Sequence, residues 1–148
     1  MKISTRGQYG TRLLLDLALS QEQEPVLLRD IARRQNIPLA YLKHLVPPLV
    51  SAGILRSARG AGGGLLLARP PEQIKLNEVV SLLEGPIAPV DCLSDPAVCR
   101  RSGFCAPQDM WRKLQTAMID ALESFSLREL MENQKEKDAR PAGAMYNI

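Results

Sequence analysis

The chain has 148 residues, of which 45% are hydrophobic and 24% are charged. These values are typical of one ordinary folded domain, or of one small domain with an appended element, and they exclude a long disordered polyelectrolyte. No apolar run approaches the length of a membrane span, and the first residues lack the apolar stretch of a secretory signal. The sequence therefore predicts a cytoplasmic protein with no membrane partner.

The charge is distributed unevenly along the chain. Residues 1–70 hold ten Lys and Arg against four Asp and Glu, a net charge of +6, whereas residues 71–148 hold nine against twelve, a net charge of −3. A basic first half is typical of a surface that meets a polyanion such as nucleic acid. On charge alone, chance clustering on a solvated surface explains the asymmetry equally well.

The first third of the chain predicts three helices. Residues 8–20 repeat apolar side chains at the helical spacing, and residues 27–35 form a second, short helix with arginines outward. A third helix follows from about residue 38. Its inward face is Leu42, Leu45, Val46 and Leu49, and its outward face includes Ala40, Lys43, His44 and Pro47. Pro47 and Pro48 predict a kink near residues 43–47, and Gly53 is expected to end the helix as a left-handed cap.

Two short apolar runs, 54–57 and 65–68, surround a glycine-rich tip and predict a β-hairpin. Three helices followed by such a hairpin predict a mainly α, winged helix-turn-helix fold in which the third helix enters the major groove of double-stranded DNA. Arg59, at the tip of the wing, suits a narrow minor groove. The alternative is a generic helical domain with a mobile loop. A phosphate-binding loop is excluded, because Leu65 and Leu66 follow Gly64 where that motif requires Lys and Ser or Thr.

The residues expected to contact DNA lie on the outer face of the third helix and on the wing. They are Ala40, Tyr41, Lys43, His44, Ser57, Arg59 and Gly60. His44 is the only histidine of the chain, and contact with DNA or simple surface exposure explains it better than a role as a metal ligand. No nucleophile–base pair or pair of catalytic carboxylates stands out, so the sequence does not predict an enzyme.

Three cysteines, Cys92, Cys99 and Cys105, are separated by six and five residues in a segment that predicts a loop. In a reducing cytoplasm, an odd number of clustered thiols favours metal or redox chemistry over structural disulfides. Thiolates hold both zinc and iron–sulfur clusters. The segment has no regular apolar pattern, so without a bound centre it is expected to be disordered.

The remaining elements are a short helix over 76–84, a long helix from near Gln108, and a short helix capped by Ser126. The long helix carries an apolar stripe with alternating spacings of three and four: Trp111, Leu114, Met118, Ala121, Leu122 and Phe125. Such a stripe predicts pairing with a second copy, which makes a homodimer suited to a palindromic operator. The predicted organisation is a DNA-binding domain over 1–84, a cysteine loop over 85–107, a dimerisation helix with a short following helix over 108–137, and a disordered tail over 138–148.

Three stretches resemble one bacterial family. The opening Met-Lys-Ile-Ser-Thr-Arg-Gly-Gln-Tyr-Gly, the pair Tyr41-Leu42, and the wing from Ala52 to Gly64 are similar to the winged-helix regulators that include IscR, NsrR, RirA and CymR. The resemblance continues through the cysteines, the Trp111 helix and residues 127–130. It implies a dimeric transcription factor. Some members carry an iron–sulfur cluster on three cysteines and sense iron, nitric oxide or redox state, whereas others lack these cysteines.

For this chain the resemblance implies an iron–sulfur cluster, of the 2Fe–2S or the 4Fe–4S type, with Cys92, Cys99 and Cys105 as ligands. The family's fourth ligand is a histidine shortly after the third cysteine, or an acidic residue near position 8 of the partner chain. This sequence has Pro107 and Gln108 at the first place and Gln8 at the second. The fourth ligand is therefore open among Asp91, Asp95, Asp109, a small thiol and water.

Two alternatives to the iron–sulfur cluster hypothesis remain open. A regulator of the same fold could use the cysteines to bind zinc or as a thiol redox switch. The other alternative is a small enzyme of iron–sulfur metabolism, against which the lack of acid–base residues argues. In the favoured mechanism, the cluster controls the spacing of the two recognition helices of a dimer and so the affinity for DNA.

Overall fold

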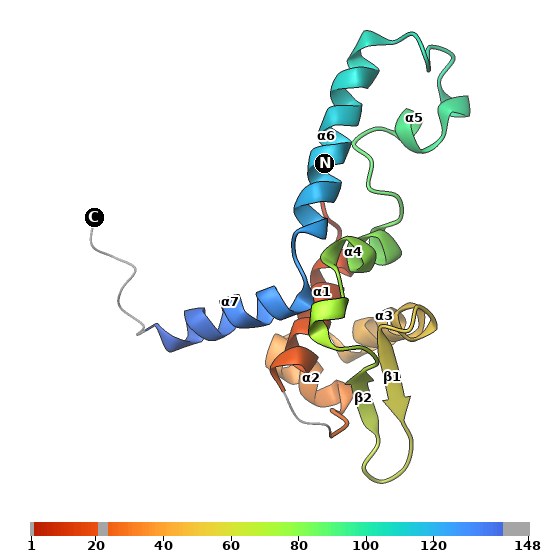
Figure 1. Ribbon diagram of the computed structural model, residues 1–148. Helices are drawn as coiled ribbons and strands as arrows, with labels where there is room; N and C mark the ends of the chain where they lie inside the picture. Colours follow the sequence, from red (N-terminus) through yellow and green to blue (C-terminus); the bar gives the residue numbers. More distant parts are fainter. Residues whose placement is uncertain (1, 21–23, 141–148) are drawn as a thin grey trace.

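The computed structural model describes residues 2–20 and 24–140 and confirms the mainly helical winged architecture (Figure 1). The elements in chain order are α1 (Thr5–Leu19), α2 (Leu28–Gln35), α3 (Leu39–Ser51), β1 (Leu55–Ala58), β2 (Gly64–Leu67), α4 (Leu76–Glu84), α5 (Asp91–Ser94), α6 (Ala106–Glu123) and α7 (Leu127–Ala139). Two short 3₁₀ turns, Pro71–Gln73 and Pro96–Val98, lie between them.

Several predicted boundaries were wrong by a few residues. Helix α1 begins at Thr5 rather than at residue 8, because the Ser4 side chain caps it by accepting a hydrogen bond from the Arg6 N–H at 3.1 Å. Helix α7 continues through Ala139, so the predicted disordered tail does not begin at 138. The rest of that tail, residues 141–148, lies outside the described residues.

The core forms where α1, α2, α3, α4 and the hairpin meet. Its fully buried side chains include Leu13, Leu42, Leu45, Leu49 and Ile54. Burying each such side chain contributes about 1.5–3 kcal/mol, so this cluster holds the domain together. Val46, predicted to be inward, is only partly buried at the edge of the core, as is Tyr9.

Helix α3 runs unbroken through Pro47 and Pro48. Pro38 stands at the N-cap, so the helix starts one residue later than predicted. Gly53 follows the last turn with φ of +68°, the left-handed conformation expected of it. A second left-handed residue, Asn36 with φ of 51°, ends α2 and makes the tight turn into α3.

The wing is an antiparallel hairpin in which Leu55 pairs with Leu67 and Ala58 pairs with Gly64. Each strand is shifted by one residue from its prediction. Val26, before α2, bonds to the β2 side of the hairpin through both its N–H and its carbonyl. A Cβ on Gly64 would lie 2.6 Å from the Val26 carbonyl oxygen, so only glycine allows this approach. The wing is thereby tied to the helical domain at the strand end next to its tip loop.

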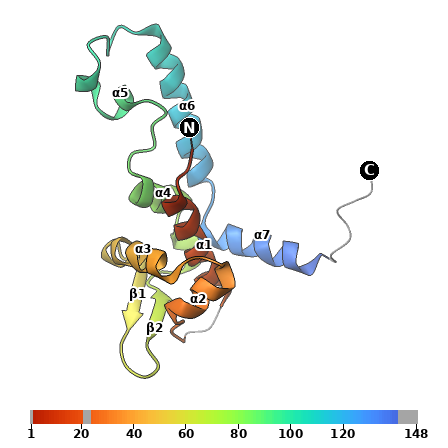
Figure 2. The ribbon, with the colours of Figure 1, turned by 180° about the vertical axis from the view of Figure 1, so that it is seen from behind.

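Beyond α4 the chain leaves the winged domain. Helix α6 projects away from the domain, and the cysteine-bearing segment lies at its far end (Figures 1 and 2). This segment contains α5 and the turn Pro96–Val98, whereas the sequence predicted no regular structure there. Within the described residues, no helix is long and apolar enough to cross a membrane.

The junction between α6 and α7 is fastened back onto the winged domain. The Leu76 N–H donates to the Phe125 carbonyl, and the Leu127 N–H donates to the Ile74 carbonyl, both at 2.9 Å. Ser126 and Glu129 form the capping box that starts α7, and Leu127 is buried in the core. This anchor sets the direction in which α6 leaves the domain.

Candidate nucleic-acid interface and cysteine segment

The outer face of α3 presents Ala40, Lys43 and His44 to solvent, as predicted. Tyr41 is half-buried, because its ring packs edge-on against Tyr9 of α1, with centroids 5.4 Å apart and planes at 85°. Tyr41 therefore braces α3 against α1 and offers only part of its surface to a ligand. The exposed face carries Lys43 and His44 beside the apolar Pro47 and Val50, and a helix with such exposed polar and basic side chains suits the major groove of DNA.

The wing brings a second basic element beside α3. Ser57, Arg59 and Gly60 are all exposed, and Arg59 directly follows β1 in the loop that joins the two strands of the wing (Figure 1). Gly60 has φ of +102°, a conformation that side chains rarely adopt, so the tip turn requires glycine at this position. Arg56, in the exposed face of β1, is a further basic side chain that the sequence analysis did not select.

A network of polar side chains joins α1 to α2. Asp16 of α1 is 5% exposed and accepts hydrogen bonds from Arg34 Nε at 3.1 Å and from Gln35 Nε2 at 2.9 Å. The hydrogen bond to Asp16 raises the pKa of Arg34. A buried carboxylate without these partners would be strongly destabilising, so the network fixes the α1–α2 crossing. Arg34 is held in this network while its side chain stays 43% exposed.

Glu84, the last residue of α4, clamps the start of α1. Its carboxylate accepts hydrogen bonds from the Ser4 hydroxyl at 2.6 Å, the Ser4 N–H at 3.2 Å and the Gly7 N–H at 2.8 Å. The Ser4 hydroxyl is the largest cause of a lowered pKa of Glu84. A Cβ on Gly7 would lie 2.5 Å from this carboxylate, so glycine is needed for the close approach.

The Glu84 clamp predicts a pH dependence of stability. Because the folded pKa is lowered from 4.5, the clamp contributes fully above that pH, and the contribution is lost as the pH falls through the lowered pKa. Glu84→Gln should destabilise the protein at pH 7 by about 1–2 kcal/mol, since it weakens the charge-assisted hydrogen bonds. The difference from wild type should shrink towards acidic pH. Urea unfolding at a series of pH values measures it, and a constant difference would contradict the clamp.

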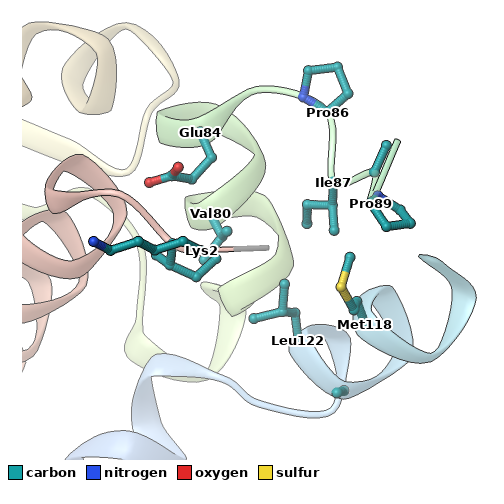
Figure 3. Close-up of a pocket in the computed structure, with 11 residues that line it drawn as sticks. Lys2, Val80, Glu84, Pro86, Ile87, Pro89, Met118 and Leu122 are labelled. Atoms are coloured by element: carbon teal, nitrogen blue, oxygen red, sulfur yellow. The ribbon is translucent and has the colours of Figure 1, made fainter. Parts of the chain in front are cut away.

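Glu84 also borders a cavity of about 550 Å³ between the winged domain and α6. Figure 3 shows Val80 of α4, Ile87 of the linker, and Met118 and Leu122 of α6 around this space. Lys2 and Ile3 line it from the N-terminal side. Gln115 of α6 also donates to the Ile87 carbonyl at 2.9 Å. These contacts hold α6 against α4 and the linker, so they help to fix the orientation of α6 relative to the winged domain.

The structure places the three predicted ligands in different local settings. Cys92 lies in α5, Cys99 follows the turn Pro96–Val98, and Cys105 is the N-cap of α6. All three are free and half-buried. Across residues 2–20 and 24–140, no three Cys, His, Asp or Glu side chains are gathered closely enough to hold a metal ion. The donor chemistry fits a soft metal, but this conformation does not assemble the ligand set.

The candidates for a fourth ligand differ in their hydrogen-bond partners and in their exposure. Asp95 accepts a hydrogen bond from the Ala97 N–H at 3.0 Å, and Asp109 lies 3.4 Å from Arg112. Asp91 is exposed on α5. Gln108 is buried and bonded inside the segment, a role that the sequence analysis missed. Gln108 is a polar residue at the start of an amphipathic helix, and such a residue is ordinarily exposed, so the sequence did not indicate that it would be buried.

Most of the chain matches known transcriptional regulators. Residues 3–133 match the Rrf2 family model, described as an iron-dependent transcriptional regulator. The protein rrf2 of Nitratidesulfovibrio vulgaris is 41% identical, over 88% of this chain and 87% of that protein. CymR of Bacillus subtilis, named an HTH-type transcriptional regulator, is 37% identical over 88% and 89% of the two chains.

Solved structures agree with these relatives. CymR of B. subtilis, described as a global cysteine regulator, superposes with a TM-score of 0.76 at 35% identity, covering 90% of this chain and 98% of that one. IscR of T. potens superposes with a TM-score of 0.77 at 32% identity, covering 99% and 97%. The winged domain, its exposed basic face and these matches agree: the chain belongs to the Rrf2 family and is a DNA-binding transcriptional regulator rather than an enzyme.

Proposed function

We propose that this regulator acts in the cytoplasm as a homodimer on a palindromic DNA operator, and that its cysteine segment controls the affinity for DNA. The observation that carries the proposal is the joint exposure of Lys43 and His44 on α3 and of Arg59 on the adjacent wing. Helix α3 then enters the major groove, and Arg59 enters the neighbouring minor groove, where the negative potential is strongest.

Helix α6 supports the homodimer. Gln108 is the only buried residue in α6, whereas Trp111, Leu114 and Met118 are half-buried and Phe125, just beyond the helix, is 43% exposed. An apolar stripe that its own domain leaves uncovered is suited to a two-fold contact with the same stripe of a second copy.

The charges along α6 favour one orientation of that contact. Its first half carries Asp109, Arg112 and Lys113, a net charge of +1, and its last turns carry Asp120 and Glu123, a net charge of −2. Two antiparallel copies bring the basic part of each helix beside the acidic part of the other, whereas parallel copies place like charges together.

Cys92, Cys99 and Cys105 are the residues that would hold an iron–sulfur cluster, which would supply sensitivity to iron, redox state or nitric oxide. The description of the family as iron-dependent supports a centre that contains iron. The second candidate is a thiol or zinc switch, and a solved structure of CymR of Staphylococcus aureus that is named an oxidized form supports its thiol version. In both cases a change at the thiols would shift α6. The contacts of α6 with α4 and the linker, beside Glu84, would then pass that shift to the winged domain.

The experiment that separates these candidates is an absorbance spectrum of anaerobically purified protein, with iron and sulfide analysis. A brown protein containing both elements supports the cluster. A colourless protein with zinc, or one whose DNA affinity changes on thiol oxidation, supports the switch. Absence of iron, sulfide and zinc, together with DNA binding that is insensitive to oxidation, contradicts control by the cysteines.

The DNA contact itself is tested by Arg59→Ala. Loss of a groove contact should lower the affinity for a cognate palindrome by about 5- to 150-fold, which corresponds to roughly 1–3 kcal/mol. Arg128→Ala, which removes the same charge from the exposed face of α7, is the matched control and should leave the affinity nearly unchanged. Gel-shift titrations at one fixed salt concentration measure both variants. Equal affinity of Arg59→Ala and wild type would rule out the wing contact.

A further inference from the structure

Gln108 is an unusual residue to bury. It lies in the first turn of α6 and is 5% exposed, while every other side chain of that helix is at least partly accessible. Burying an amide group costs free energy unless its donors and acceptor are satisfied. The interior of the cysteine segment must therefore supply partners for it.

The amide bonds at both of its ends. Its Oε1 accepts a hydrogen bond from the Gly103 N–H at 3.1 Å, and its Nε2 donates to the Ser102 hydroxyl at 3.0 Å and lies 3.5 Å from the Cys92 carbonyl oxygen. Gly103 has φ of +95°, so the turn that presents its N–H is accessible mainly to glycine. One side chain thus joins α5, the turn at 102–103 and the start of α6.

These bonds fasten parts of the chain that carry the cysteines: Cys92 lies in α5, and the Ser102 N–H donates to the Cys99 carbonyl at 3.0 Å. Gln108 reaches the backbone of Cys92 directly, and it lies one helical turn after Cys105. In the described part of the chain, no other side-chain hydrogen bond joins α5 or the turn at 102–103 to α6. The conformation that it fastens is one in which the thiols are not gathered around a metal site.

We propose that Gln108 is a latch that keeps the cysteine segment folded without metal, and that this latch must open before the three thiols can converge. This is the opposite of the disorder that the composition of the segment predicts for the metal-free state. The regulatory consequence rests on the proposed role of the cysteines, whereas the latch itself does not. A folded metal-free state gives the regulator two ordered conformations rather than one ordered and one disordered.

The latch is tested on the reduced, full-length protein with chelator present and without DNA. Hydrogen exchange followed by mass spectrometry reports on the backbone of residues 91–105, and timed alkylation reports on the three thiols. Wild type should exchange and alkylate more slowly than the urea-unfolded chain. Gln108→Ala should raise both rates by about tenfold or more, because it removes every bond of the latch.

Two further variants control this result. Gln108→Glu keeps the size of the side chain but buries a carboxylate whose oxygen would face the Cys92 carbonyl, so its rates should be at least as high as those of Gln108→Ala. Gln115→Ala removes an amide-to-backbone bond from the same helix at the linker and should leave the cysteine segment unchanged. Circular dichroism establishes that each variant keeps the helical fold.

Zinc titration tests the opening step. If the latch opposes convergence of the thiols, Gln108→Ala should bind Zn²⁺ about fivefold or more tightly than wild type, since no latch has to be broken. Wild-type rates in the chelated Gln108→Ala protein would overturn the latch, and equal or weaker zinc affinity would overturn its opposition to metal. Neither outcome depends on DNA binding or on cluster content, so a failure here is distinct from a failure of the proposed function.

Discussion

Leu114→Asp is expected to convert the protein into a monomer at micromolar concentration and to lower its affinity for a palindromic operator by about a hundredfold or more. Leu114 is half-buried in the middle of the α6 stripe. A carboxylate there would lose its water on dimerisation without gaining a partner, and that penalty is several kcal/mol. A monomer occupies only one half-site, so the gain from linking two binding events disappears.

Sedimentation equilibrium and gel-shift titration measure the two effects. Thr116→Asp is the matched control, because Thr116 is exposed and lies on the opposite side of α6 from Leu114. It introduces the same charge into the same helix and should leave the dimer intact. A Leu114→Asp protein that still sediments as a dimer would show that the interface lies elsewhere. If the Thr116→Asp protein also dissociates, the loss of the dimer is caused by the added negative charge on α6 and not by the position of Leu114.

Each single replacement of Cys92, Cys99 or Cys105 by alanine is expected to abolish retention of a cluster while leaving the fold intact. Each replacement removes one of the three thiolates that would hold the cluster, and the two that remain are too few to retain it. The fold should persist, because the three cysteines lie outside the buried core and are only half-buried themselves. Thermal unfolding of the three variants should therefore lie close to that of wild type.

The measurement is the visible spectrum with iron and sulfide analysis after anaerobic reconstitution. His44→Ala is the control, because it removes the only histidine of the chain from the exposed face of α3, where no cysteine lies. It should retain the wild-type spectrum and lose DNA affinity. Three cysteine variants that all keep the wild-type spectrum would remove the cysteines from cluster binding and leave a DNA-binding regulator without this control.

The winged domain could be predicted from the sequence because its signals are local. The spacing of Leu42, Leu45 and Leu49 marks the inner face of α3, and the tip glycines mark the hairpin. Gly53 was expected in the left-handed conformation and adopts it. The boundary errors at Thr5 and at the strands are of one to three residues. They arise where a cap or a bridge to a distant residue, such as Val26, extends or shifts an element.

The cysteine segment was harder to predict. The sequence identified its chemistry, because three clustered thiols are informative wherever the backbone places them. It did not predict α5 or the turn Pro96–Val98, since short helices without an apolar face leave no periodic pattern. It also did not predict that Gln108 would be buried, because hydrogen bonds from one amide to residues 102 and 103 require a specific folded loop.

The sequence by itself determined the order of the helices, the wing, the exposed basic residues and the identity of the three thiols, because each depends on neighbours within a few residues along the chain. Only the tertiary structure decided how these parts are connected. Glu84 meets Ser4 across 80 residues, and Asp16 meets Arg34 across 18. Such polar contacts have no period and no fixed spacing in the sequence, so their partners are defined only when packing of the core brings distant segments together.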